Sequence, residues 1–498
     1  MIQYNPDELF QLQDGRCIAS PVLSRRMAYI KSVRPESSWQ EDSTPYTWDH
    51  MGMAALFSEC YMDDTRYCPY AKSWYTYTES GVWAIDSGAV LVNQKAKEFV
   101  RLMSLYCGEI PFDPDDDEDD IRKKYLAFVA KMGTRSFREQ MIKDAADEMV
   151  IDAAEFDANP MLINCKNGTY DLETMTFRHH DPADFLTHQT NFDFTIHRDV
   201  TCPRWEQFID EITQGDKDKA DFLQRALGYS MLGRANEECM FILHGKTTRN
   251  GKSTLLNTVE RLLGDYSTAA PVELICRTDR PANAESANPV LASLKGKRFV
   301  TMAENDNMGR LDESTIKRLT GGEAITARKL YQEPITYTPQ FTIWLSCNDL
   351  PAICDKSLFA SQRIHLVEFN RHFSQEEQDK GLKDYFLTPD AARGIFMWML
   401  RGLQMYRRRG LVTTSELLKP VESYERDNDL ILQFLEQKCS HSEGAVTPKK
   451  DLYARYKIWC KSNGYRPFSI KKFLSELLTH PEWVTDRDRE SVEGLRLV

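Results

Sequence analysis

The amino-acid sequence predicts an α/β fold with a parallel sheet at its centre, a mainly helical region before it and a small, basic helical domain after it. From Met240 onward, short apolar runs alternate with helical segments, the order typical of a parallel sheet with crossover helices. Ahead of that point, helical periodicity dominates residues 121–154 and 205–232. A chain of 498 residues is also too long for one hydrophobic core, and a prior of roughly 150 residues per domain suggests about three domains.

The bulk composition favours a soluble globular protein. The hydrophobic fraction is 42%, and no apolar run approaches the roughly 18 residues of a membrane-spanning helix. The N-terminus lacks a basic stretch followed by an apolar one, so we expect a cytoplasmic protein with no membrane partner. The net charge of -12 argues against a surface that coats nucleic acid throughout, so any DNA binding has to be concentrated in basic patches.

The twelve cysteines do not form a recognisable site. They are scattered singly from Cys17 to Cys460 with no Cys-x-x-Cys pair, and the closest pairs lack the spacing of a zinc site. We therefore expect reduced cysteines that pack in the interior.

Residues 1–110 are expected to form an aromatic-rich α+β domain. Residues 74–86 alternate in polarity and carry Gly81 at a plausible turn, which predicts a hairpin. Its aromatic side chains could stack on single-stranded bases, but packing within a small domain is the preferred interpretation.

Residues 111–200 are expected to hold an acidic linker followed by a helical and β-hairpin region. The run at residues 113–120 is almost wholly acidic, and a solvated, self-repelling linker is preferred over a metal-chelating site. Farther on, Asn167 and Gly168 form a strong turn signal between two strands.

A phosphate-binding loop is predicted at residues 245–253. The apolar strand at residues 240–244 leads through Gly245 to Gly251-Lys-Ser253 and then to a helical segment. The loop is one residue longer than the strict Gly-x-x-x-x-Gly-Lys-Ser pattern, because Lys246 stands where that pattern has its first glycine. The strand, loop and helix context nevertheless predicts ATP and Mg²⁺ as cofactors. The expected nucleotide-binding residues are Gly245, Thr248, Asn250, Gly251, Lys252, Ser253 and Thr254.

Backbone amides at the helix start would face the phosphates at the positive end of the helix dipole. Lys252 would reach the β and γ oxygens, and the hydroxyl of Ser253 would complete the magnesium shell. We therefore predict a catalytic role for Lys252 and a metal-binding role for Ser253.

Two further apolar strands each deliver a polar residue to the predicted carboxyl edge of the sheet. The strand at residues 298–303 ends at Glu304, a candidate to hold magnesium and polarise the attacking water. The strand at residues 341–347 ends at Asn348, which could bond the γ-phosphate or orient the water, although it could also only cap a turn. Both are predicted catalytic residues because ligands gather at the carboxyl ends of strands in open α/β sheets.

Four segments resemble the superfamily III helicases, specifically the helicase part of phage and plasmid primase-helicases related to the poxvirus primase-helicase. The segments are Asn250-Gly-Lys-Ser-Thr254, the strand from Gly296-Lys-Arg298 to Glu304, Lys317-Arg-Leu-Thr-Gly-Gly-Glu-Ala-Ile-Thr-Ala-Arg-Lys-Leu-Tyr331, and Ser346-Cys-Asn-Asp-Leu-Pro351. The resemblance covers roughly residues 45–475. It implies an AAA+-like P-loop ATPase domain with a helical collar at residues 201–415, a hexameric ring with ATP sites between subunits, and 3'-to-5' movement along DNA.

The resemblance also implies functions for two segments beyond the loop. A β-hairpin between Glu304 and Asn348 would project into a central pore, where Arg328, Lys329 and Tyr331 could grip a single strand. A basic surface turn is the alternative. The family usually has two adjacent arginines near residue 362, and Arg363, which follows Gln362 here, is the expected arginine finger for a neighbour's γ-phosphate.

Residues 425–498 are expected to form a winged-helix-like domain. Its predicted elements are a helix, a turn and two further helices. Residues 449–472 carry eight lysines and arginines against the single acid Asp451. Lys471 and Lys472 fall in the possible recognition helix, residues 469–478. A plain helical cap with a solvated face is the alternative.

The preferred function is that of a ring-shaped DNA helicase in the replication system of a phage, prophage or plasmid, acting on single-stranded and forked DNA in a bacterial host. The first 110 residues show no zinc-binding cysteine set and no convincing catalytic carboxylate pair, so priming is expected from a separate protein. The alternatives are an initiator or loader that remodels an origin without processive unwinding, and a generic P-loop phosphotransferase.

Overall fold

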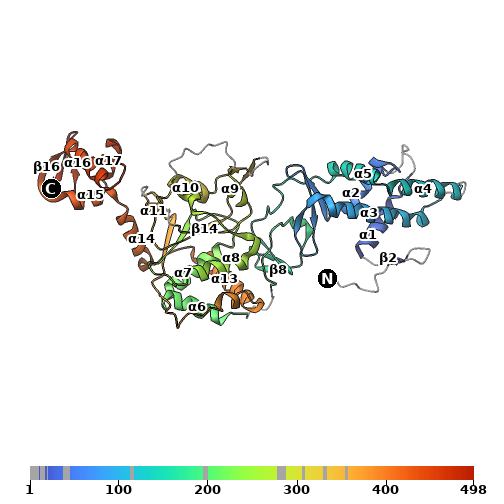
Figure 1. The fold of residues 1–498 in the computed structure, drawn as a ribbon, viewed down its shortest axis with the longest axis horizontal. Helices are drawn as coiled ribbons and strands as arrows, with labels where there is room; N and C mark the ends of the chain where they lie inside the picture. Colours follow the sequence, from blue (N-terminus) through green and yellow to red (C-terminus); the bar gives the residue numbers. More distant parts are fainter. Residues whose placement is uncertain are drawn as a thin grey trace.

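The computed structural model describes residues 10–11, 17–18, 21–36, 45–112, 117–194, 200–277, 288–305, 309–328, 334–353 and 357–498. Figure 1 shows an elongated chain with three parts in a row. Helices near the N-terminus lie at one end, a β-sheet surrounded by helices lies in the middle, and a small C-terminal module lies at the other end.

The N-terminal part is a helical core with a small antiparallel sheet. Its helices are α1 (Pro21–Val33), α2 (His50–Tyr61), α3 (Val90–Tyr106), α4 (Glu118–Met132) and α5 (Arg135–Glu148). The sheet has the order β3 (Thr65–Cys68), β4 (Ser73–Tyr77), β5 (Trp83–Asp86), and a separate short pair joins β1 (Phe10–Gln11) to β2 (Cys17–Ile18).

The domain boundary expected at residue 110 does not separate two cores in the structure. Side chains of α4 and α5, among them Tyr125 and Met141, pack in the same hydrophobic cluster as Phe57 of α2 and Phe99 of α3. The acidic run also differs from a plain linker. Asp117 caps the N-terminus of α4, and acidic residues fill the first turn of this helix, where the dipole favours negative charge. Residues 113–116 lie outside the described residues.

The aromatic hairpin forms as predicted, with β4 pairing antiparallel to β5. Trp74 and Trp83 are buried, and Tyr75 stacks on Phe156 with the ring centroids 4.4 Å apart. Most of this aromatic surface therefore packs within the protein, which is the interpretation preferred from the sequence.

A connecting region joins the N-terminal part to the central sheet. It contains β6 (Leu162–Cys165), β7 (Gly168–Asp171) and β8 (Thr176–Arg178), followed by α6 (Pro203–Thr213) and α7 (Lys217–Tyr229). A hairpin turn forms here, but one residue earlier than predicted: Lys166 and Asn167 join β6 to β7, and Gly168 is already part of β7, where it pairs with Cys165. Buried Arg298 fastens this region to the central sheet by donating hydrogen bonds to the carbonyl oxygens of Met231 and Leu162.

The central sheet is parallel and has five strands in the order β10-β11-β14-β9-β15. The strands are β9 (Met240–His244), β10 (Ser267–Ala269), β11 (Phe299–Ala303), β14 (Thr342–Cys347) and β15 (Ile364–Glu368). Alternate residues of each strand enter different cores: Phe241 and Trp344 pack on one face, and Ile242 and Leu345 on the other. Burial of both faces explains why the strands are continuous apolar runs in the sequence.

Helices and one hairpin complete the central part. The helices are α8 (Lys252–Leu263), α9 (Pro289–Ser293), α10 (Glu313–Thr320), α11 (Ser357–Ala360), α12 (Leu382–Tyr385), α13 (Pro389–Arg409) and α14 (Ser415–Asp427). The hairpin pairs β12 (Ile325–Ala327) with β13 (Ile335–Tyr337). The domain extends beyond the expected end at residue 415, because Leu417 and Tyr424 of α14 pack in the two cores of the sheet.

The C-terminal module has its own hydrophobic core. It contains α15 (Leu430–Lys438), β16 (Cys439–Pro448), α16 (Lys449–Ser462), α17 (Ile470–Leu477), β17 (Thr485–Asp486) and β18 (Ser491–Leu497). The three strands form an antiparallel sheet in the order β16-β18-β17. The order expected from the sequence lacked β16, whose polar and exposed residues give little apolar alternation.

In the part of the chain that the structure describes, no helix combines the length and apolar composition needed to cross a bilayer.

Candidate functional site

The loop between β9 and α8 turns sharply at two glycines. Gly251 precedes α8 with a φ of 90°, and a Cβ atom there would lie 2.4 Å from Cγ2 of Ile212. A Cβ atom on Gly245 would lie 2.5 Å from Nδ2 of Asn250. Both positions therefore require glycine, which is the physical reason for the glycines of the sequence motif.

Lys252 lies at the centre of the site. Its side chain is buried, and its Nζ donates hydrogen bonds to the carbonyl oxygen of Gly245 and to Oδ1 of Asn348, each at 3.0 Å. Burial lowers the pKa of the Lys252 ammonium, and the neighbouring Cys347 and Glu304 oppose that shift. The loop after β9 and the end of β14 thus meet at one amine.

Glu304 joins the same group of side chains. Its carboxylate accepts hydrogen bonds from the backbone N–H groups of Asn348 and Asp349, and its own N–H donates to the carbonyl oxygen of Ser346 at 2.9 Å. The structure therefore brings Lys252, at the start of α8, together with Glu304 and Asn348, which directly follow β11 and β14, at the carboxyl edge of the sheet.

The outer part of the loop is supported from inside and open to solvent outside. Asn250 is buried and donates to the carbonyl oxygen of Thr247 at 2.6 Å, whereas Thr248 and Ser253 are exposed. Thr254, the third residue of α8, is partly buried.

The segment after β15 holds the outer loop, and the sequence did not indicate this contact. Nδ1 of His372 lies 2.8 Å from the carbonyl oxygen of Thr248, and the N–H of Phe373 donates to the carbonyl oxygen of Arg249 at 2.9 Å. In the sequence, only the position of this segment directly after a strand of the same sheet indicates that it could contact the loop.

This arrangement suits a polyanionic ligand with a divalent cation. The N-terminus of α8 presents backbone N–H groups, and the Lys252 ammonium adds a positive charge beside them. The exposed hydroxyl of Ser253 and the carboxylate of Glu304 are oxygen donors of the kind that Mg²⁺ prefers. Among the described residues, no group of three or more His, Cys, Asp and Glu side chains could hold a metal ion, so a Mg²⁺ here would take most of its ligands from phosphate and water.

A hairpin lies between Glu304 and Asn348, as the sequence predicted. Strands β12 and β13 pair antiparallel, and Arg328 follows β12 as an exposed residue at the start of the tip. The other two predicted DNA contacts, Lys329 and Tyr331, lie outside the described residues.

Arg363 lies at the opposite edge of the sheet from Lys252. Its carbonyl oxygen accepts a hydrogen bond from the N–H of Met240, the first residue of β9, whereas Lys252 follows the last residue of that strand. Its guanidinium pairs with Glu238 and donates to Oγ1 of Thr320 at 2.9 Å. Arg363 therefore cannot reach the loop of its own chain.

Lys471 and Lys472 are exposed on α17 of the C-terminal module. The ammonium of Lys472 lies 4.6 Å from the centre of the Phe468 ring. These lysines form no part of the group around Lys252.

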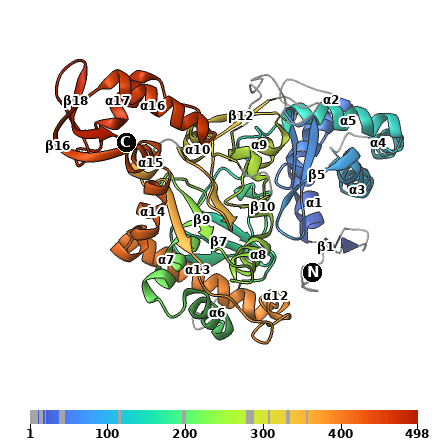
Figure 2. The ribbon, with the colours of Figure 1, turned by 60° about the vertical axis from the view of Figure 1, so that its left-hand side comes forward.

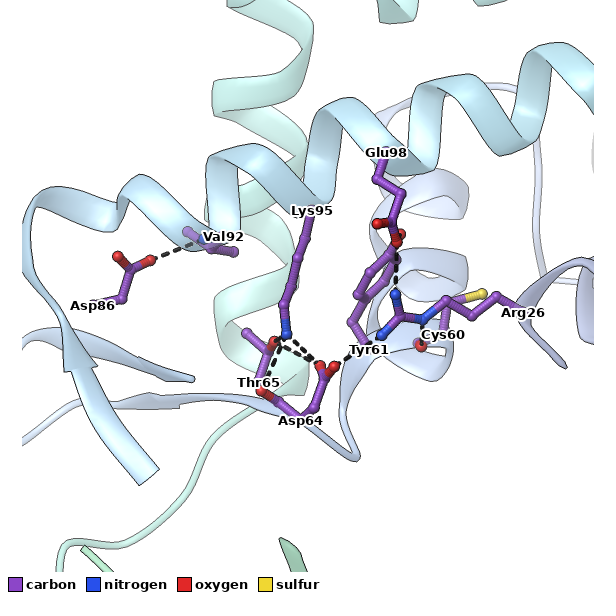
Figure 3. Close-up of polar contacts among 9 residues, drawn as sticks. All are labelled: Arg26, Cys60, Tyr61, Asp64, Thr65, Asp86, Val92, Lys95 and Glu98. Carbon is purple, nitrogen blue, oxygen red and sulfur yellow. Dashed lines mark hydrogen bonds and ion pairs between the residues drawn. The ribbon is translucent and has the colours of Figure 1, made fainter. Parts of the chain in front are cut away.

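A second cluster of charged groups lies in the N-terminal part, and Figure 3 shows Arg26 and Lys95 converging on Asp64 from two helices. Arg26 also bonds Glu98 at 2.6 Å, and its guanidinium carbon lies 3.7 Å from the centre of the Tyr61 ring. Burial lowers the pKa of Lys95, although the attraction of Asp64 opposes this. Because each charge faces an opposite charge, we assign the cluster to the packing of α1, α2 and α3.

Three family models match separate parts of the chain. Residues 54–214 match a model described as "D5 N terminal like", and residues 426–491 match one described as "Poxvirus D5 protein-like". Between them, residues 243–363 match "Family of unknown function (DUF5906)".

Viral proteins are similar to most of the chain. "Putative helicase L207/L206" of Acanthamoeba polyphaga mimivirus is 26% identical over 423 residues, which cover 78% of this chain and 43% of that protein. "Putative helicase 121R" of Invertebrate iridescent virus 3 is 26% identical over 335 residues, covering 61% of this chain and 35% of that protein. The chain thus spans less than half the length of these relatives.

Among solved structures, "The A form apo structure of NrS-1 C terminal region-CTR" superposes with a TM-score of 0.46 at 10% identity, covering 90% of this chain and 99% of that one. The regions on either side of the parallel sheet therefore match D5-type family models, and most of the chain is similar to viral proteins named as helicases.

Proposed function

We propose that this chain is an ATP-driven DNA helicase of superfamily III type, acting as a ring in the replication system of a virus, phage or other mobile genetic element. The observation that carries the proposal is the convergence of Lys252, Glu304 and Asn348 at one edge of a parallel sheet, directly beside a glycine-bounded loop at a helix start. The names of the viral relatives support DNA as the substrate.

The proposed chemistry begins with phosphate binding by the loop. The triphosphate would accept hydrogen bonds from backbone amides between Asn250 and Ser253, and Lys252 would exchange its bond to the Gly245 carbonyl oxygen for phosphate oxygens. Magnesium bound by Ser253 would neutralise the phosphate charge. The bound phosphates would also lie beside Gly245, Thr248 and Thr254.

Hydrolysis would depend on the two strand ends. Glu304 would accept a proton from, or orient, the attacking water, and the side-chain amide of Asn348 would hold the water or the γ-phosphate. The contact of the Glu304 carboxylate with the Asn348 N–H keeps these two groups in a fixed relation. A ligand that moves one of these two groups would therefore also move the other.

The position of Arg363 supports a site shared between two copies of the chain. Arg363 lies at the edge of the sheet away from its own Lys252, so it could stabilise phosphoryl transfer only in a neighbouring subunit. Sites shared in this way would suit a closed ring, for which we propose a hexamer. We propose that the hairpin of β12 and β13 in each subunit faces DNA in the pore, and that Arg328, together with Lys329 and Tyr331 from outside the described residues, contacts the strand. Movement along the strand would run 3' to 5'.

An origin-binding initiator or loader is the second candidate, and the basic C-terminal module favours it. Exposed Lys471 and Lys472 on α17 would place positive charge on duplex DNA if the module docks as a winged helix. Such a protein would hydrolyse ATP to remodel an origin without continuous unwinding.

A strand-displacement experiment distinguishes these candidates. Forked DNA with a 3' or a 5' single-stranded tail is mixed with the protein, Mg²⁺ and ATP, and release of the labelled strand is followed. A helicase releases the strand from the 3'-tailed fork, and the Lys252→Ala variant releases none. ATP hydrolysis without strand release at either polarity would exclude the helicase, and hydrolysis stimulated by duplex but not by single strands would favour the initiator.

A further inference from the structure

A large cleft separates the aromatic sheet of the N-terminal part from the edge of the central sheet. It has a volume of about 1020 Å³. Residues of β4 and β5 line one side, and residues of β10, of α9 and of the turn after α9 line the other. Figure 2 shows β5 beside β10 and α9. The volume is at the upper end of the roughly 300–1,000 Å³ typical of small-ligand sites, so the cleft has room for more than one nucleotide.

The cleft carries an excess of positive charge in an acidic protein. Lys72, Lys295 and Lys297 line it, and the carboxylate among the residues that line it belongs to Asp157. That carboxylate is engaged by its own neighbours, because it accepts a hydrogen bond from the N–H of Thr187 at 2.8 Å and faces His188. Lys295 and Lys297 also donate hydrogen bonds to backbone carbonyl oxygens, of Ala153 at 2.8 Å and of Asp265 at 2.6 Å, but these neutral partners leave their positive charge in place. The ammonium groups therefore outnumber the carboxylate among the residues that line the cleft.

Aromatic side chains lie beside these lysines. Trp83 and Phe156 are buried and form part of the wall, whereas Tyr70 and Tyr75 are partly exposed. Tyr75 is stacked on Phe156. Tyr70, at the turn between β3 and β4, packs beside the same buried cluster, remains partly exposed and lines both this cleft and a neighbouring cavity, so a base could meet its exposed part. Alternating ammonium groups and flat rings are the means by which proteins hold single strands without reading their sequence.

The cleft leads to the hairpin of β12 and β13. A smaller cavity of about 370 Å³ shares Tyr70, Phe156 and Lys295 with the large one and is also lined by all three residues of β13. Ile335, which lines both cavities, pairs with Ala327, the residue before Arg328. A strand held at the hairpin could therefore continue into the cleft.

We propose that this cleft binds single-stranded nucleic acid, with phosphates near Lys72, Lys295 and Lys297 and a base on Tyr70. The inference rests on the proposed helicase function and adds a second contact surface for the single strand, outside the hairpin. The N-terminal part would then guide the strand that the central sheet moves.

Binding of a fluorescent oligothymidine of about 20 nucleotides to the full chain, followed by anisotropy at several salt concentrations, tests the proposal. Lys72→Glu weakens binding at least about fivefold and reduces the slope of log affinity against log salt by about one. Tyr70→Leu weakens binding about tenfold by removing the flat ring, whereas Tyr70→Phe stays within about twofold. Lys97→Glu on α3 is the matched control, because this exposed lysine does not line the cleft and its variant binds as wild type does.

Crosslinking locates the strand independently of affinity. An oligonucleotide that carries 5-iodouracil is irradiated on the wild-type protein, and crosslinks are expected in residues 70–85. Melting midpoints equal to that of wild type exclude misfolding of the variants. Normal binding by Lys72→Glu and Tyr70→Leu, with crosslinks confined to other regions, would overturn the inference and leave the helicase standing. Failure of the wild type to bind single strands would instead remove the proposed function itself.

Discussion

At the residue scale, Lys252 holds two contacts that a nucleotide would have to replace or share. Its ammonium bonds the carbonyl oxygen of Gly245 and the side-chain oxygen of Asn348. Hydrogen bonds from a charged donor are worth about 1.5–3 kcal/mol each, so the loop keeps a defined shape around the amine. Phosphate oxygens carry more negative charge than either partner, and they would compete effectively for the same donor.

The Glu304→Gln variant is expected to bind ATP as the wild type does but to hydrolyse it much more slowly. The amide keeps the size of the side chain and can still accept from the N–H groups of Asn348 and Asp349, so the loop and the binding of ATP are preserved. The neutral amide cannot take a proton, and hydrolysis is expected to fall at least 100-fold, in line with the loss of a general base. Fluorescent-nucleotide binding and phosphate release measure the two effects. Hydrolysis within a few fold of wild type would show that another group activates the water.

The sequence predicted which residues meet at this edge of the sheet, but not all their partners. Lys252, Glu304 and Asn348 were predictable, because each follows an apolar strand and the carboxyl ends of parallel strands meet at one edge. The support of the outer loop by His372 and Phe373 was not predictable, since two hydrogen bonds between residues more than 100 positions apart leave no pattern in the chain.

At the element scale, β15 closes one edge of the central sheet and carries a histidine between aromatic rings. His365 lies 5.3 Å from Phe241 and 5.5 Å from Phe222 between ring centroids. Burial lowers the pKa of His365 to about 4. The neutral imidazole is therefore the form that suits the packing of β15 against β9 and α7.

This shift predicts a loss of stability in mild acid. Below about pH 6.5 the unfolded chain binds a proton at His365, whereas the folded chain does not until the pH approaches 4, so the free energy of unfolding falls through that window and is unaffected above it. At pH 5 the cost is about 2 kcal/mol. Urea unfolding at pH 7 and pH 5 measures it, and His365→Phe should show a pH-dependent loss smaller by that amount. An equal loss in both proteins would contradict the assignment.

Element boundaries near changes of charge were the least predictable from the sequence. The acidic run was expected to be a linker, but Glu118, Asp119 and Asp120 begin α4, where the helix dipole stabilises them. Periodicity indicated helices in residues 121–154 without showing which core they join. The packing of Tyr125 against α2 and α3 is a long-range property that this pattern does not contain.

At the scale of the whole molecule, Arg363 places a constraint on assembly. It pairs with Glu238 at the amino edge of the sheet, so its proposed role requires a second subunit. The cleft beside β5 likewise depends on two parts of the chain that meet only in the folded structure. Neither the cleft nor the position of Arg363 at the amino edge of the sheet is visible in local sequence patterns.

Co-expression of two inactive variants tests the shared site. Lys252→Ala and Arg363→Ala are each expected to hydrolyse ATP at a few per cent of the wild-type rate. Each proposed site takes its loop from one copy and its arginine from the neighbouring copy. Mixed rings would therefore contain intact sites at about a quarter of the interfaces, and ATP hydrolysis should recover to a similar fraction of the wild-type rate. Glu238→Gln, which breaks the ion pair but keeps the arginine, is the control and should remain active. No recovery in mixed rings would place Arg363 outside the site.

The central claim is that the edge of the sheet around Lys252 hydrolyses ATP in response to DNA. Its most direct test is the rate of phosphate release from ATP by the wild type and by Lys252→Ala, each with and without single-stranded DNA. We predict hydrolysis by the wild type that single strands stimulate, and a loss of at least 100-fold in the variant under both conditions. Hydrolysis that persists in Lys252→Ala, or a wild-type rate that does not respond to DNA, would contradict it.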